Sequence, residues 1–219
     1  MRRWWTALLI AGMSLPALAI SADALFDQVA AVLEKAPWQA RMVGRIITPN
    51  GDIQAADLIV KTLPKNEIVR IEFQKPDALA DNYVVITPEK VYNYLFLTNQ
   101  VIVYPRGRAR IEGLGVSLSR LGELEDLGGE GIAWELVGEE QTEAGPAYHL
   151  VGRPQDPGEA GFTRVELWVL KDPPRPLAYR VLGLEGEVLA DLTWHDLRRA
   201  RLDVERLLEY PPDAEVIEK

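Results

Sequence analysis

The sequence predicts an α+β fold in which one antiparallel sheet of about eleven strands carries a few helices. Extended segments with alternating apolar and polar residues dominate the chain. Two other stretches have apolar residues at helical spacing, and turn-favouring Gly, Pro, Asn and Asp separate the segments. The chain has no internal repeat or inter-domain linker, so residues 20–219 are expected to form a single domain.

Residues 1–19 are expected to be a secretory signal peptide. Arg2 and Arg3 precede an apolar run, and Ala17-Leu18-Ala19 has the small-x-small pattern of a cleavage site. The alternative is a membrane anchor, for which the apolar run is short. The sequence contains no cysteine, so disulfides, thiolate metal sites and a lipidated N-terminal cysteine are excluded. We expect an exported, soluble product that is not lipidated.

The first element after residue 19 is expected to be a helix. Ser21 or Asp23 can cap it, and Pro37 ends it near Ala36. Its apolar residues recur at helical spacing: Leu25, Phe26, Val29, Val32 and Leu33. The next segments, 38–47 and 53–63, are predicted strands joined by an Asn-Gly turn.

The stretch 67–105 predicts four short strands joined by turns. Val69, Ile71 and Phe73 alternate with Arg70 and Glu72, so the three apolar residues share one face. The strand at 91–96 also gathers aromatic residues on one face: Tyr92, Tyr94 and Phe96. Apolar residues occur on both faces of this stretch, which indicates a sheet that is covered on both sides here.

Residues 106–131 interrupt the strands and are predicted to form one or two short helices. Their leucines recur every three residues and end at a glycine pair: Leu118, Leu121, Leu124, Leu127 and Gly128-Gly129. These helices could be core elements or a lid lying across the sheet. Strands resume at 132–140, 147–153, 162–171, 177–184 and 188–194. Within the third of these, Trp168 lies on the face opposite to Val165, Leu167 and Val169.

No pattern in the sequence predicts a catalytic residue, a metal site or a cofactor. His195 and Asp196 are neighbours, and on a strand they would point to opposite faces. Zinc-binding spacings, G-x-S-x-G and a phosphate-binding loop are absent. With 33 acidic and 24 basic residues the chain has a formal net charge of −9, so nucleic acid and anionic membrane surfaces are not expected partners.

Three segments resemble the periplasmic lipoprotein carriers of the localisation-of-lipoproteins (LolA-like) superfamily. Phe73-Gln74-Lys75-Pro76-Asp77 comes first, and Glu89-Lys90-Val91-Tyr92-Asn93-Tyr94 is similar to the family's G-K-x-L-W-x-Y-x-P segment. The ending Glu209-Tyr210-Pro211-Pro212-Asp213-Ala214-Glu215-Val216-Ile217 is similar to F-x-x-P-x-G-x-x-V. The resemblance implies an unclosed antiparallel β-barrel with helices covering its concave face and an apolar cavity between them.

The same resemblance implies a monomeric periplasmic carrier that binds acylated lipoproteins or lipids. It would load at an inner-membrane releasing complex and unload at an outer-membrane acceptor. The alternatives are a lipid- or lipoprotein-sensing interaction module of the envelope and an unrecognised carboxylate-based hydrolase. The candidate cavity residues are Val69, Ile71, Phe73, Tyr92, Tyr94, Leu118, Leu121 and Trp168.

One departure from the family concerns control of the lid. Characterised carriers have an arginine before a proline near the end of the second strand, whereas this chain has Val60-Lys61-Thr62-Leu63-Pro64. Arg41, Arg45 and Arg70 are the candidates to replace that arginine.

Overall fold

The computed structural model describes residues 20–47, 51–106 and 131–219. The strands are β1 (Trp38–Ile47), β2 (Ile53–Leu63), β3 (Ile68–Lys75), β4 (Tyr83–Ile86), β5 (Lys90–Leu95), β6 (Gln100–Pro105), β7 (Ile132–Thr142), β8 (Gly145–Pro154), β9 (Arg164–Lys171), β10 (Pro174–Leu182), β11 (Val188–Arg199) and β12 (Glu215–Glu218). The helices are α1 (Ala22–Leu33), α3 (Pro157–Ala160) and α4 (Val204–Leu208), with 3₁₀ turns η1 (Pro64–Asn66), η2 (Asp77–Leu79) and η3 (Phe96–Thr98).

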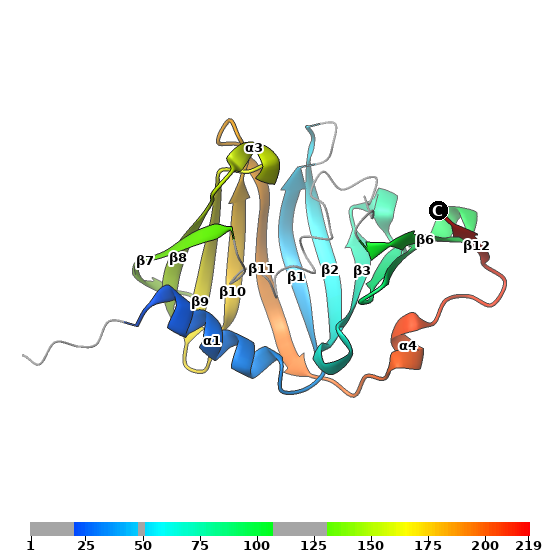
Figure 1. Cartoon of the computed structure of the whole chain (residues 1–219), viewed down its shortest axis with the longest axis horizontal. Coiled ribbons are helices and arrows are strands. Elements are labelled where there is room, and N and C mark those ends of the chain that lie inside the picture. Colours follow the sequence, from blue (N-terminus) through cyan, green and yellow to red (C-terminus); the bar gives the residue numbers. More distant parts are fainter. Residues whose placement is uncertain (1–19, 48–50, 107–130) are drawn as a thin grey trace, which may run out of the picture.

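All twelve strands belong to one sheet, in the order β12-β6-β5-β4-β3-β2-β1-β11-β10-β9-β8-β7 (Figure 1). The strands from β1 to β6 and those from β7 to β11 form two antiparallel meanders, and the β1–β11 ladder joins them. Because β12 and β7 stand at opposite ends of this order, the sheet is an unclosed barrel. The predicted fold class is therefore confirmed.

The described residues form twelve strands rather than about eleven, because of β12. Each predicted strand segment contains an observed strand, and β12 lies in the C-terminal stretch, where no strand was expected. It pairs with β6 in parallel, with Val216 opposite Val101 and Ile217 opposite Ile102. A strand of four residues that begins and ends with glutamate gives almost no periodicity to detect.

Helix α1 begins at the cap that the sequence allowed at Ser21. The Ser21 hydroxyl accepts a hydrogen bond from the backbone N–H of Ala24 at 3.1 Å. The helix ends at Leu33, three residues before the expected Ala36. It packs against β10 and β7, with Leu25 fully buried and Phe26 edge-to-face on Trp134. Figure 1 shows α1 (blue) crossing the lower ends of these strands.

We call the face of the sheet that α1 covers the inner face. Its buried residues form one apolar cluster, the inner cluster, to which α1 and most strands contribute: Ala22, Leu25, Trp38, Ala40, Met42, Ile46, Ala56, Leu58, Val60, Val69, Ile71, Phe73, Val84, Ile86, Val91, Leu150, Leu167, Val169, Tyr179, Ala190, Leu192 and Trp194. These positions alternate along each strand, as the pleat requires.

The opposite, outer face has its own apolar cluster over β2–β6. This outer cluster comprises Leu63, Ile68, Tyr83, Val85, Tyr94, Val101, Val103 and Leu207. Leu207 comes from α4, which packs against β3, and Leu202, Val204, Leu208 and Ala214 extend the cover. The structure thus explains why 67–105 is apolar on both faces, because the inner cluster lies on one side and the C-terminal segment on the other.

Candidate ligand-binding face

Three of the candidate cavity residues lie together on the inner face. Val69, Ile71 and Phe73 all belong to the inner cluster. In the ladders of β3, Ile71 stands between Val60 of β2 and Val84 of β4. Directly opposed residues share a face, so the apolar surface continues across all three strands.

Two further candidates, Tyr92 and Tyr94, lie on the outer face. Tyr94 belongs to the outer cluster and Tyr92 packs against it. The Tyr94 ring stacks on Tyr83 with centroids 4.7 Å apart, and its hydroxyl donates to Asn99 Oδ1 at 3.2 Å. The structure therefore does not bring these tyrosines together with Val69, Ile71 and Phe73.

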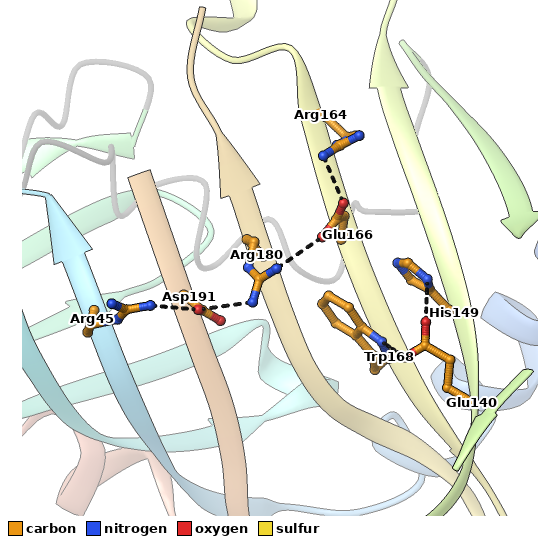
Figure 2. A network of polar contacts seen from close by, with 8 residues as sticks. All are labelled: Arg45, Glu140, His149, Arg164, Glu166, Trp168, Arg180 and Asp191. Carbon is orange, nitrogen blue, oxygen red and sulfur yellow. Dashed lines mark hydrogen bonds and ion pairs between the residues drawn. The ribbon is translucent and has the colours of Figure 1, made fainter. Parts of the chain in front are cut away.

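Trp168 also lies on the outer face, within a polar group (Figure 2). Its indole stacks on His149 with centroids 4.6 Å apart and donates from Nε1 to Glu140 Oε2 at 3.0 Å. The other Glu140 oxygen lies 2.9 Å from Nδ1 of His149. Glu140 thus fixes both rings. Leu118 and Leu121, the remaining candidates, lie outside the described residues.

A ladder of ion pairs crosses the outer face beside Trp168, as Figure 2 shows. Asp191 lies between Arg45 at 3.3 Å and Arg180 at 3.2 Å. Arg180 also approaches Glu166 at 3.6 Å, and Arg164 lies 3.1 Å from the same carboxylate. The ladder connects β1, β11, β10 and β9, so this half of the outer face is polar while the inner face beneath it is apolar.

The other two lid-control candidates also lie on the outer face. Arg41 makes a two-pronged contact with Asp57, from Nε at 2.7 Å and from Nη2 at 2.5 Å. This contact lowers the pKa of the Asp57 carboxyl and raises that of the guanidinium.

Arg70 attaches the C-terminal segment to the sheet. Its Nη1 donates to the carbonyl oxygens of Leu207 at 3.0 Å and Glu209 at 2.8 Å, and its Nε donates to Glu72 at 2.9 Å. The guanidinium lies 3.7 Å from the centre of the Tyr83 ring, whose hydroxyl donates to the Glu209 carbonyl. Burial raises the pKa of Tyr83 to about 12, so this hydroxyl keeps its proton at neutral pH.

Four buried polar side chains lie on the inner face that were not expected from the sequence to belong to a site. Trp38, Thr62, Tyr179 and Trp194 are buried there, and their polar side-chain atoms have no hydrogen-bond partner in the described part of the chain. Burial also raises the pKa of the Tyr179 hydroxyl. Alternation within 38–47 predicts that Trp38 shares a face with Ala40 and Met42, and this was the signal in the sequence that could have placed Trp38 on the inner face.

No helix among the described residues is long and apolar enough to cross a membrane. Residues 20–47, 51–106 and 131–219 contain no group of three or more His, Cys, Asp or Glu side chains placed to hold a metal ion.

No family model and no curated protein matches the chain. Among solved structures, an uncharacterized conserved protein from Thermus thermophilus is 34% identical, with a TM-score of 0.69 over 90% of this chain and 99% of that one. A DUF1329 family protein from Desulfovibrio piger is 14% identical, with a TM-score of 0.52 over 85% and 95%. A LolA superfamily protein from Nitrosomonas europaea is 12% identical, with a TM-score of 0.46 over 87% of this chain and 99% of that one.

The Desulfovibrio piger protein shares the fold of this chain, an open and mostly antiparallel sheet. The Thermus thermophilus protein is similar in sequence as well as in structure, over almost its whole length. The chain therefore belongs to the same family as this uncharacterized conserved protein from Thermus thermophilus.

Proposed function

We propose that the protein is a periplasmic carrier that binds acyl chains of lipoproteins, or related lipids, on the inner face and shuttles them towards the outer membrane. The observation that carries this proposal is the continuous inner cluster, which extends across β1–β5 and β8–β11 of an open sheet. An open sheet can admit a long flexible chain from its side. An apolar face of this extent matches the chemistry of that chain.

The energetics of acyl burial are sufficient for a carrier. Each buried methylene contributes about 0.8 kcal/mol, so about 12 of them would contribute about 10 kcal/mol before ordering costs. No directional polar contact is needed for this term. Handing the cargo to an acceptor requires only that the acceptor bind it more tightly than the carrier does, because the difference in binding free energy then favours transfer.

Several parts of this proposal come from the sequence. Residues 1–19 would be removed on export, leaving residues 20–219 as one monomeric domain in the periplasm. An inner-membrane releasing complex and an outer-membrane acceptor would load and unload it. We propose that it acts without catalysis. His149 is bonded to Glu140 on the outer face, and His195 is exposed on β11, so neither histidine faces the inner cluster.

The first experiment is native mass spectrometry, with lipid extraction, of the mature protein purified gently from its own periplasm. The expected result is a co-purified acylated molecule. A clean mass of the protein alone, unchanged after incubation with a triacylated lipopeptide, would contradict the carrier function and favour a sensing module.

The second experiment compares the same substitution on the two faces. Val69→Glu places a carboxylate on the inner face, and Val103→Glu places one in the outer cluster, where the native valine is also buried. We expect Val69→Glu to abolish acyl binding and Val103→Glu to retain it in the folded fraction, because a charge repels an acyl chain only where the chain lies. Circular dichroism checks folding, and Val69→Thr serves if the glutamate variants unfold. Retained binding in folded Val69→Glu would contradict the assignment of the inner face.

A further inference from the structure

Three buried polar side chains meet at one end of the inner face. Trp38, Thr62 and Trp194 are 7%, 1% and 9% exposed. The Nε1 atoms of both indoles and the Thr62 hydroxyl have no hydrogen-bond partner among the described residues. An indole N–H can only donate, so both tryptophans need an acceptor, whereas the hydroxyl can donate or accept.

The β1–β2 ladder places Thr62 beside Trp38, and a ring contact places Trp194 beside Trp38. Thr62 of β2 stands directly opposite Trp38 of β1, and the two indole rings lie with centroids 5.5 Å apart at an angle of 40°. On its other side Thr62 stands opposite Val69, the first residue of the candidate cavity strand. This polar group therefore adjoins the apolar surface that would hold an acyl chain.

The surroundings favour an uncharged acceptor. In the described part of the chain, the buried charged residues are Asp57 and Glu166, and both form ion pairs on the outer face. Arg199 stands opposite Trp38 in the β1–β11 ladder, but it is exposed at the end of the strand. Among the described residues a carboxylate or phosphate beside the indoles would find no counter-charge, and burying an unpaired charge costs far more than burying a neutral carbonyl.

We propose that Trp38, Trp194 and Thr62 form a subsite for the carbonyl oxygen of an ester or amide at the head of an acyl chain. This inference rests on the proposed function and deepens it. The aliphatic chain binds the apolar inner face beside Val69, and the carbonyl accepts hydrogen bonds from the indole N–H groups. The subsite thereby distinguishes acylated molecules from hydrocarbons, which have no acceptor, and from ethers of the same length, which lack the carbonyl and have only a weaker acceptor oxygen.

The test measures discrimination between an ester lipid and an ether lipid. Dipalmitoyl phosphatidylcholine and its dihexadecyl ether analogue compete for the protein against diphenylhexatriene, an apolar dye without acceptor oxygens. A triacylated lipopeptide is the third competitor. The variants are Trp38→Phe, Trp194→Phe and Thr62→Val, which remove the polar atom and keep most of the apolar surface. Trp168→Phe is the control, because its N–H is bonded to Glu140 on the outer face.

We expect the wild-type protein to bind the ester more tightly than the ether. Each tryptophan variant should lose about threefold to tenfold in ester affinity relative to ether affinity, the effect of one net hydrogen bond. Trp168→Phe should behave as the wild type. The same loss for the lipopeptide alone would identify an acylated peptide as the source of the carbonyl, and a loss for phosphatidylcholine alone would identify a membrane lipid.

Other outcomes separate the failure of this inference from the failure of the carrier function. Equal binding of ester and ether by the wild type, or an equal loss in Trp168→Phe, would overturn the subsite while leaving the carrier intact. Displacement of the dye by none of the three competitors would overturn the proposed function and the subsite with it. Thermal unfolding of each variant shows whether the binding measurements are made on folded protein.

Discussion

Replacing Arg70 with methionine should loosen the C-terminal segment from the sheet. Methionine keeps an apolar stem on β3 but removes the guanidinium that donates to the Leu207 and Glu209 carbonyls. It also removes the cation that lies over the Tyr83 ring. The Arg70 side chain is only 12% exposed, so these contacts are screened less than those of a surface ion pair.

The expected loss follows from the individual contacts. Hydrogen bonds from a charged donor contribute about 1.5–3 kcal/mol, and a partly buried cation–π contact contributes about 1 kcal/mol. Some of this is recovered as the freed carbonyls meet water, so we expect a loss of about 3 kcal/mol in the free energy of unfolding. In a domain of this size that loss lowers the melting temperature by roughly 10 °C.

Two assays check this prediction against a matched control. Arg153→Met removes an exposed arginine whose ion pair with Glu135 spans 3.3 Å, and it should change stability by at most about 1 kcal/mol. Thermal unfolding compares the two variants. Hydrogen exchange should show faster exchange at residues 202–214 in Arg70→Met only. A melting temperature no lower than that of Arg153→Met, with protection unchanged at 202–214, would refute the role of Arg70.

Two further predictions concern the contacts that β1 makes with its neighbours β2 and β11. The Arg41 guanidinium lowers the pKa of Asp57, so this pair stabilises the fold above the carboxyl's usual pKa of 3.8, and the contribution is lost as the pH falls below it. Asp57→Asn should therefore reduce the fall in the free energy of unfolding with falling pH in this range, measured by denaturant titration at several pH values. The same fall in wild type and variant would exclude the pair as its source. A Cβ at Gly44 would collide with the Asp191 carbonyl oxygen, so Gly44→Ala should cost at least about 2 kcal/mol. Gly138→Ala, where a Cβ meets open space, should cost less than about 1 kcal/mol, and equal melting temperatures would disprove the clash.

The sequence was most informative where alternation could be followed along one strand. The positions of Val69, Ile71 and Phe73 follow from the pleat alone, and so does their separation from Arg70. The Ser21 cap was likewise visible, because a serine before an apolar helical pattern has a specific backbone donor to satisfy.

The faces of different strands could not be related in the same way. Alternation shows that Tyr92 and Tyr94 share a face, but only the pairing register shows that this face is opposite to that of Val69. The same limit applies to Trp168, which was expected in the cavity and lies among ion pairs on the outer face. Short elements with long-range partners, such as β12, are set by tertiary pairing rather than local propensity.

The β1–β11 ladder also has a consequence for the order in which the sheet can form. Met42 lies opposite Trp194, so β1 gains its second neighbour only after most of the chain is available. The two meanders can each form from local hairpins. The β1–β11 ladder, the seam between them, closes a long loop, so it has the largest loop-closure entropy cost and is expected to form last. Until the seam forms, the edge of β1 and the apolar residues beside it stay open to other chains. A newly synthesised molecule is therefore most exposed to aggregation at what becomes the centre of its finished sheet.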